Sequence, residues 1–266
     1  MILSMASVPN DDEEILKQLR KRILEVACTS SEGHVPSALS ILDILYCLYV
    51  KLPTLSSLNV TTTDSFILSK GHAAIGFYAI LERAGLISPS WAHDFAKFDS
   101  DFGGHPDVCK VKEVNASTGS LGHGLSLAVG KIIAKRLTNS NFRIYCLLGD
   151  GELNEGSNWE GLLLASHHKL KELTVIIDYN ESTDRALSLG HLENKLKSFG
   201  FRVLPVNGHS HLELCAALME RSGDQPLAIL ANTVKGFGVP VMVNNPMWHH
   251  KSPNSEELKR ILGDIQ

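Results

Sequence analysis

The sequence lacks the features that define several common classes of protein. It has no basic excess, because 25 Lys and Arg residues stand against 29 Asp and Glu residues and give a net charge of -4. This balance argues against nucleic acids or anionic membranes as partners. No apolar run approaches the roughly 18 residues that a membrane-spanning helix requires. Neither a P-loop nor a dinucleotide-binding glycine pattern occurs, which argues against a generic nucleotide-binding protein.

Cysteines are few, and their spacing fits neither a disulfide framework nor a zinc site. The chain has five of them at widely separated positions: Cys28, Cys47, Cys109, Cys146 and Cys215. Most lie in apolar patterns typical of helices or strands, so we expect reduced core residues in a cytoplasmic protein. Five histidines, namely His167, His168, His191, His209 and His211, are expected to have structural or solvated roles, because none of them has metal-ligand spacing with a neighbouring Cys or carboxylate that would suggest zinc.

Apolar strand-like runs alternate with helix-like stretches along the chain. This alternation predicts an α/β fold, namely a doubly wound, mostly parallel sheet with helices on both faces. We expect one domain over residues 1–266, with an irregular tail from Gly236 to Pro253 and a final helix from Ser255 to Leu262. The predicted strands are residues 65–68, 142–148, 173–177, 202–206 and 226–233, and the other predicted helices are residues 11–27, 73–84, 122–137, 158–170, 192–199 and 211–221, with one more that begins near residue 37.

Two of these helices need a neighbour. The helix that begins near Ser37 is apolar almost all round, which predicts burial between layers or in a subunit contact. The helix over residues 122–137 carries small residues such as Gly124 and Gly130, which permit close approach of another backbone or of a cofactor.

Asp150 and Asn180 stand at corresponding places in the predicted sheet. Asp150 lies between Gly149 and Gly151 directly after one strand, and Asn180 closely follows the next. The stretch between them has the length of a βαβ crossover, and ligands of open α/β sheets bind beyond the carboxyl ends of the strands. Carboxylate and amide oxygens are hard ligands that suit Mg²⁺ or Ca²⁺, and Mg²⁺ commonly completes its shell with water and phosphate oxygens. The pair therefore predicts a metal-diphosphate site.

The segment from Gly149 to Asn180 resembles the thiamine diphosphate motif of the transketolase family. Further segments agree with that family in order and spacing: Ser31-Glu-Gly-His34, Leu68-Ser-Lys-Gly-His-Ala73, Gly103-Gly-His-Pro-Asp107, Ser117-Thr-Gly-Ser-Leu-Gly-His-Gly124 and Trp248-His249. The resemblance runs from about Glu13 to Pro253, but it corresponds to only the amino-terminal third or so of a full transketolase. The chain is thus similar to the amino-terminal subunit of a split transketolase.

This resemblance implies roles for individual residues. Thiamine diphosphate would be anchored by Mg²⁺ (or Ca²⁺) on Asp150, Asn180 and the main-chain carbonyl of Ser182. Cofactor contacts are implied for His72, Gly119, Leu121, Gly149, Asp150, Gly151, Glu155, Asn180 and His249. Catalytic contacts with the sugar are implied for His34, His72, His105 and His249, a task that suits imidazole because it titrates near neutral pH.

Some positions leave alternatives open. His250 adjoins His249, and the sequence does not decide which of the two points inward, although the family pattern favours His249. His123 stands where many family members have Gln, so it is either a cofactor contact or a turn residue. Glu160 is either an acid between two cofactors at a subunit interface or part of a solvated helix face.

Two segments depart from the family pattern. The run from Glu181 to Ala186 replaces a more usual apolar, glycine-containing run, which predicts a changed loop and a changed wall beside the cofactor. Pro36 and Ser37 stand where relatives often have glycine, which predicts a stiffer or differently shaped substrate entrance.

The resemblance implies that the chain needs a partner. In this family the glutamate that activates the cofactor lies in a pyrimidine-binding domain, and the sequence ends before any such domain. We therefore expect a separate carboxyl-terminal subunit with the pyrimidine-binding and carboxyl-terminal domains, in an α2β2 heterotetramer.

The leading functional hypothesis is a transferase that moves a two-carbon ketol unit from a ketose or its phosphate to an aldose or its phosphate. A subunit of another thiamine diphosphate enzyme, similar to 1-deoxyxylulose-phosphate synthase or to a 2-oxo-acid decarboxylase, is an alternative, but His105 favours a hydroxylated donor. A non-catalytic subunit that binds cofactor or regulates a partner is the remaining alternative.

Overall fold

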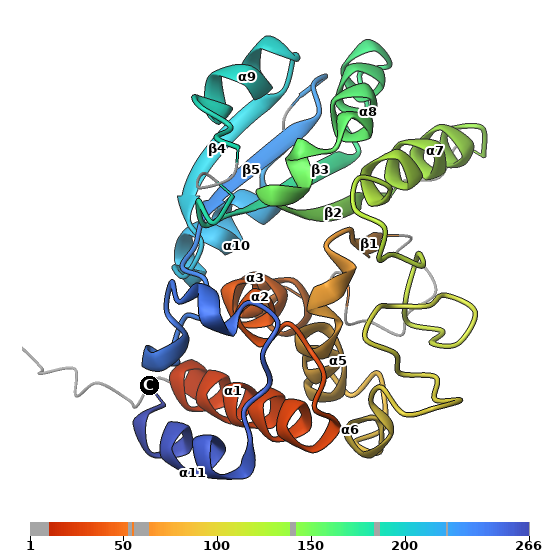
Figure 1. Cartoon of the computed structure of the whole chain (residues 1–266). Coiled ribbons are helices and arrows are strands. Elements are labelled where there is room, and N and C mark those ends of the chain that lie inside the picture. The colour runs from red at the N-terminus through yellow and green to blue at the C-terminus, as the bar shows by residue number, and fades with distance from the viewer. Residues whose placement is uncertain are drawn as a thin grey trace, which may run out of the picture.

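A parallel sheet lies between two layers of helices in the computed structural model, which describes residues 11–52, 55, 64–138, 142–183, 187–221 and 223–265 (Figure 1). The strands are β1 (Ser65–Leu68), β2 (Ile144–Gly149), β3 (Leu173–Tyr179), β4 (Arg202–Asn207) and β5 (Leu227–Asn232). They lie in the order β1-β2-β3-β5-β4, and each neighbouring pair is parallel. The predicted doubly wound α/β fold is confirmed.

The helices divide between the two faces of the sheet. One layer contains α1 (Asp11–Ser30), α2 (Val35–Ser40), α3 (Leu42–Tyr46), the π-helical η1 (Cys47–Lys51), α5 (Ala74–Arg83), α6 (Trp91–Asp94), α10 (His211–Met219) and α11 (Ser255–Asp264). The other contains α7 (Gly124–Arg136), α8 (Gly156–His167) and α9 (Leu192–Ser198). Short 3-10 helices lie in the connections: η2 (Gly71–Ala73), η3 (Gly151–Asn154), η4 (Pro240–Met242) and η5 (Pro246–Trp248).

Strand β2 shows why this chain forms a sheet with two covered faces. Tyr145 and Leu147 pack into the apolar cluster on the α1 side, while Cys146 and Leu148 pack into the cluster on the α7 side. Successive side chains of a strand point to opposite faces, so a strand that is covered on both faces must be apolar at every position. This burial explains the continuous apolar run in the sequence.

The prediction of a single continuous helix after Ser37 is wrong. The segment is divided into α2, α3 and η1, because Ile41 leaves the helical conformation with φ -104° and ψ 1°. Its expected burial between layers is confirmed, since Leu39, Leu42 and Leu45 are inaccessible to solvent within the chain's own core. This segment therefore offers no apolar surface to a partner subunit.

Most other element bounds agree with the predictions within a few residues. Strand β3 continues to Tyr179, so that Asn180 follows the strand directly. The cysteines are all free, and Cys47 and Cys146 are buried as expected, but Cys109 is exposed because it lies in the irregular connection between α6 and α7. Within the part of the chain that the structure describes, no helix combines the length and apolar character needed to cross a membrane.

Candidate cofactor and active site

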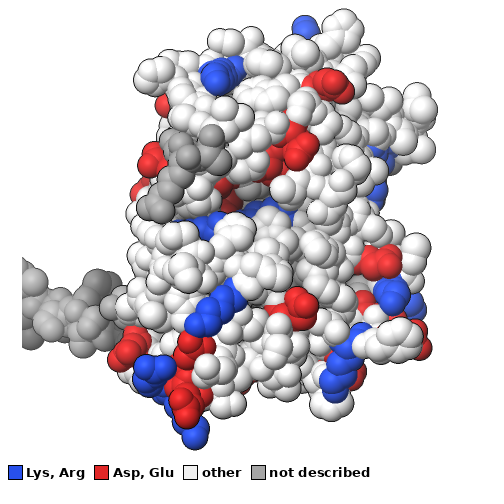
Figure 2. All heavy atoms as spheres, in the orientation of Figure 1, with Lys and Arg blue, Asp and Glu red and all other residues white. Residues whose placement is uncertain are grey.

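The carboxyl ends of the central strands border a cavity of about 340 Å³. Gly149 at the end of β2 is in register with Asp178 of β3, which sets the loops after these strands side by side. The cavity lies between the sheet and the segments that precede α2, η2 and α7, so residues distant in the sequence meet there. Figure 2 shows a hollow across this face in which acidic and basic groups lie next to each other.

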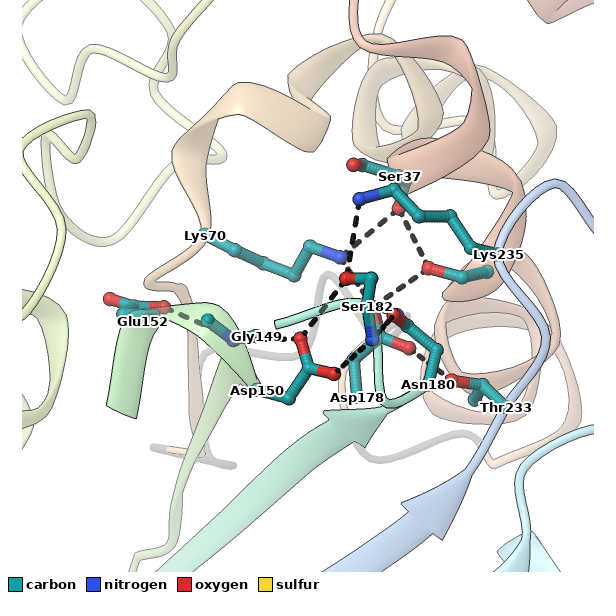
Figure 3. A network of polar contacts seen from close by, with 12 residues as sticks. Ser37, Lys70, Gly149, Asp150, Glu152, Asp178, Asn180, Ser182, Thr233 and Lys235 are labelled. Carbon is teal, nitrogen blue, oxygen red and sulfur yellow. Dashed lines mark hydrogen bonds and ion pairs between the residues drawn. The ribbon is translucent and has the colours of Figure 1, made fainter. Parts of the chain in front are cut away.

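Asp150 and Asn180 converge as their positions after neighbouring strands predict. Oδ2 of Asp150 lies 3.0 Å from the amide nitrogen of Ser182, and Oδ1 of Asn180 lies 3.2 Å from the same nitrogen. The tight return of the chain depends on Glu181, whose φ of 57° is in the left-handed region. Figure 3 shows the side chains of Asp150, Asn180 and Ser182 facing one another.

Asp150 is a buried acid, with only 3% of its surface exposed. Burial raises its pKa, and the negative charge of Asp178 raises it further, while the Gly151 amide opposes the rise. A carboxylate that is buried and close to a second carboxylate is stabilised by a nearby cation. Among the described residues, no group of three or more His, Cys, Asp or Glu side chains could hold a metal, so any metal site here must use amide or main-chain oxygens.

Lys70 and Asp178 form an ion pair in the wall of the cavity, with 3% and 0% of their side chains exposed. The aliphatic part of Lys70 passes over Gly149, where a side chain would meet it at 3.8 Å. Asp178 also accepts hydrogen bonds from the Ser40 hydroxyl at 2.7 Å and the Asn180 amide at 3.2 Å. Burial alone would raise the pKa of Asp178, but the Lys70 ammonium and the hydrogen bonds from the Thr233 and Ser40 hydroxyls together outweigh burial and lower it.

A second cation, Lys235, reaches the site from the loop after β5. Its Nζ lies 3.4 Å from the Ser182 hydroxyl and 3.2 Å from Nδ1 of His249. Burial lowers the pKa of Lys235, and the charge of Lys70 lowers it further. In Figure 3 the side chains of Lys70 and Lys235 extend into the site from opposite sides.

Histidines border the cavity on the side away from the sheet. Nδ1 of His34 donates to the carbonyl oxygen of His249 at 3.1 Å, and the His34 ring centroid lies 5.0 Å from that of His72. Burial lowers the pKa of His34 to about 4 and, together with the Lys70 charge, lowers that of His72 to about 2. Burial and the charge of Lys235 also lower the pKa of His249. These imidazoles are therefore neutral at neutral pH.

Most residues that the sequence nominated lie around this one cavity. Its lining includes His34, His72, His105, Gly119, Leu121, Gly149, Asp150, Gly151, Asn180, Ser182 and His249. The imidazole of His105 packs against Gly119, where an added Cβ would lie 3.1 Å from the ring. His250 packs against His34 with ring centroids 4.4 Å apart, but it does not line the cavity.

Three nominated residues lie outside the cavity lining: His123, Glu155 and Glu160. All three are exposed on this chain. Glu155 joins η3 to α8 and packs its Cβ against Gly122. Part of the atypical run after Asn180, residues 184–186, lies outside the described residues.

Four residues of the cavity lining or its floor had no assigned role at the level of the sequence: Lys70, Glu152, Asp178 and Lys235. A local signal existed for two of them, because Lys70 and Lys235 are the cations that follow β1 and β5 at the carboxyl edge of the sheet. No such signal existed for Glu152, because two of its partners, Ser69 and Gly122, lie in segments distant in the sequence.

Comparison with known proteins assigns this chain to a family. The family model described as transketolase, thiamine diphosphate binding domain, matches residues 12–263. The chain belongs to the transketolase family. The resemblance noted in the sequence is thus confirmed, and the family is one of thiamine diphosphate-dependent transferases.

The relatives differ in how much of their own length the chain matches. One subunit of the apulose-4-phosphate transketolase of Actinobacillus succinogenes is 35% identical over 263 residues, which cover 96% of this chain and 95% of that protein. Transketolase of Homo sapiens is also 35% identical, but the match covers 98% of this chain and 44% of that protein. The crystal structure of transketolase from Campylobacter jejuni superposes with a TM-score of 0.83 at 28% identity, covering 95% of this chain and 43% of that one.

Proposed function

We propose that this chain is the cofactor-binding, amino-terminal subunit of an enzyme that transfers a two-carbon ketol unit between sugars or sugar phosphates. One observation is the main support for this proposal: Asp150 and Asn180 converge in one cavity. His34, His72 and His105 line the same cavity. A metal-diphosphate anchor beside several neutral imidazoles suits a cofactor whose substrate is rich in hydroxyl groups.

The residues present fit a divalent cation. Asp150 supplies one charged oxygen, Asn180 supplies an amide oxygen, and we assign the main-chain carbonyl of Ser182 as the third protein ligand of Mg²⁺ or Ca²⁺. The buried state of Asp150 supports this assignment, because its raised pKa reflects negative charge that lacks full compensation. Hard oxygen donors of this kind suit either metal, and Mg²⁺ commonly shares its remaining positions with water and phosphate.

Two lysines suit the diphosphate group. Lys70 and Lys235 approach the cavity from opposite sides, and their ammonium groups can balance the negative charge of a diphosphate. Asp178 holds the Lys70 side chain in place through the buried ion pair. Thus the cavity offers separate positive groups for the diphosphate and oxygen ligands for the metal.

The histidines are placed for work on the sugar. Thiamine diphosphate, when bound, supplies the carbon nucleophile that ketol transfer requires. Because His34, His72 and His249 are neutral, each ring has one nitrogen that donates and one that accepts a hydrogen bond. In His34 the Nδ1 hydrogen is engaged by the carbonyl of His249, which leaves Nε2 as the acceptor for a sugar hydroxyl proton. We assign His105 to the donor's hydroxylated end.

The chain spans less than half of full-length transketolases, and we propose that a separate carboxyl-terminal subunit completes the site. The relative from Actinobacillus succinogenes is named as one subunit of its transketolase, which supports a divided enzyme. We propose an α2β2 assembly in the cytoplasm, where the free cysteines remain reduced.

The outer face of α7 and α8 is the surface that suits this partner. Five large apolar side chains are exposed there: Leu127 (43%), Ile133 (39%), Leu137 (84%), Leu163 (57%) and Leu164 (50%). The two helices pack together, since Gly161 of α8 lies against Leu125 of α7, and α7 begins just after the cavity residue Leu121. Several exposed apolar side chains on two packed helices beside an incomplete active site suit an obligate subunit contact.

Assays of the chain alone and with its purified partner subunit test this function. We expect ketol transfer from a ketose phosphate to an aldose phosphate only in the complex, with thiamine diphosphate and Mg²⁺ present. Pyruvate as the preferred donor would instead indicate another thiamine diphosphate reaction. Full activity of a complex that carries Asp150→Ala would indicate a subunit without a role in cofactor binding.

A further inference from the structure

Glu152 is a buried acid on the wall of the cavity, with 2% of its surface exposed. One carboxylate oxygen, Oε1, accepts hydrogen bonds from the Ser69 hydroxyl and from the Gly122 amide at 3.0 Å. The other, Oε2, accepts from the Gly149 amide at 3.2 Å. Figure 3 places Glu152 apart from the Asp150 and Asn180 pair, with Gly149 between them.

The three donors to Glu152 come from three different walls of the cavity. Ser69 directly follows β1 and precedes Lys70, Gly122 follows Leu121, and Gly149 ends β2 next to Asp150. Each donor is therefore adjacent in sequence to a residue that lines the cavity. The Glu152 carboxylate thus ties the segments of Ser69 and Gly122 to its own segment at the end of β2, in addition to the main-chain hydrogen bond that the Ser69 amide donates to the Leu147 carbonyl.

The segments that contain Ser69 and Gly122 pack closely, with no space for a side chain at Gly71 or Gly124. A Cβ added to Gly124 would lie 2.3 Å from the Ser69 hydroxyl oxygen, and one added to Gly71 would lie 2.8 Å from the main-chain carbon of Thr118. Real Cβ atoms do not approach other atoms so closely, so small changes in loop spacing change the shape of the cavity.

We propose that Glu152 is a positioning residue that holds these loops at the spacing that thiamine diphosphate requires. The inference rests on the proposed function, and it adds a residue that acts on the cofactor only through Ser69, Gly122 and Gly149. Second-layer residues of this kind orient the groups that touch a ligand, and losing one commonly weakens binding about 10- to 100-fold in metal sites.

Glu152→Gln tests this proposal directly, because it keeps the shape of the side chain but not all of the hydrogen bonds that the carboxylate accepts. Each carboxylate oxygen accepts from a backbone N–H, so the NH₂ group of Gln must face one of these donors in either orientation. We expect faster amide hydrogen exchange at Gly122 or Gly149 in the chain without ligand. We also expect a 10- to 100-fold higher Kd for thiamine diphosphate with Mg²⁺, measured by calorimetry.

Ser69→Ala is the milder companion variant, since it removes one hydroxyl donor and leaves both backbone contacts to Glu152. It should fold and weaken cofactor binding by less than Glu152→Gln does. In the complex, both variants should raise the KM for thiamine diphosphate more than they lower kcat. A role in stability alone would lower the melting temperature and leave that KM and the Kd unchanged.

The outcomes separate this inference from the proposed function. If the unaltered chain and its complex fail to bind thiamine diphosphate, the proposed function is wrong and the inference falls with it. If they bind it and Glu152→Gln binds it equally well, with unchanged exchange at Gly122 and Gly149, only the inference is wrong.

Discussion

Lys70 and Asp178 are joined by a buried ion pair although the two residues lie 108 positions apart in the sequence. Lys70 follows β1 and Asp178 belongs to β3, so the pair spans the end of the intervening strand β2. The Lys70 side chain crosses β2 at Gly149, where an added Cβ would lie 3.8 Å from it, an ordinary contact distance. The pair therefore links the outer strand to the floor of the cofactor cavity.

Breaking this pair should destabilise the protein strongly. Lys70→Met leaves Asp178 buried without its cation, a change that typically costs about 3–5 kcal/mol. Urea unfolding of the chain measures the loss. Lys197→Met removes the exposed ion pair with Glu193 and serves as the control, with an expected cost of about 0.3–0.5 kcal/mol. Equal effects of the two substitutions would contradict the importance of the buried pair.

Stability should fall as the pH is lowered from about 6.5 to about 4. In this range an unfolded histidine with a pKa of 6.5 takes up a proton, whereas folded His34, with its pKa of about 4, and His72, with its pKa of about 2, do not. The unfolded chain thus binds more protons, and each such group contributes a slope of up to about 1.4 kcal/mol per pH unit.

Urea unfolding at several pH values, compared between variants, measures that slope. His34→Gln should make it shallower, by less than the full amount because His34 is partly exposed. His93→Gln, at an exposed position on α6, is the control substitution. An unchanged slope in His34→Gln would show that another group dominates the acid sensitivity.

Mg²⁺ with thiamine diphosphate should raise the melting temperature of the chain. A ligand that binds only the folded state stabilises it by about 2.7 kcal/mol at 100 times its Kd. Asp150→Ala should abolish the increase because it removes the proposed charged metal ligand, and a chelator should reverse the increase in the unaltered chain. Glu160→Ala, at an exposed acid of α8, should retain it. An equal increase in Asp150→Ala would place the metal elsewhere.

Two glycine substitutions should have opposite effects on stability. In Gly71→Ala the new methyl group would lie 2.8–2.9 Å from main-chain atoms of Thr118 and Gly119, and overpacking of this kind costs about 1–3 kcal/mol. In Gly130→Ala the methyl group meets no atom within 4 Å, and Ala stabilises a helix interior by roughly 0.5–1 kcal/mol relative to Gly. Thermal unfolding of both variants decides the sign.

A charge on the outer face of α8 should block assembly without unfolding the chain. Leu163→Lys changes a side chain that is 57% exposed, so the melting temperature of the isolated chain should change little. Its complex with the carboxyl-terminal subunit should weaken by at least tenfold, measured by analytical ultracentrifugation. Leu212→Lys, at an 84% exposed position of α10 in the other helix layer, is the matched control. Equal weakening by both variants would place the contact elsewhere.

The sequence sufficed for those parts of the site that depend on strand ends. Asp150 and Asn180 each follow an apolar run, and parallel neighbours bring such positions together whatever the details of packing. The same logic applies to the alternation of strands and helices, which predicted the sheet and both helix layers.

The rest depends on contacts that no local pattern encodes. The partners of Glu152 lie in loops 83 and 30 residues away, and their meeting depends on the order of the strands. The segment after Ser37 has the composition of one helix, but its break at Ile41 is a matter of packing in a crowded core. Whether an apolar face is used inside the chain or left for a partner is likewise decided only by the complete fold.

The exposed leucines of α8, Leu163 and Leu164, have a consequence for expression of the protein in the cell. If this chain is synthesised in excess over the proposed partner subunit, its apolar surface stays exposed to solvent. The excess chain would then aggregate or be bound by chaperones and proteases. Expression of the two subunits at equal levels would avoid this loss of chain. Selection should therefore favour co-regulated expression of the two genes.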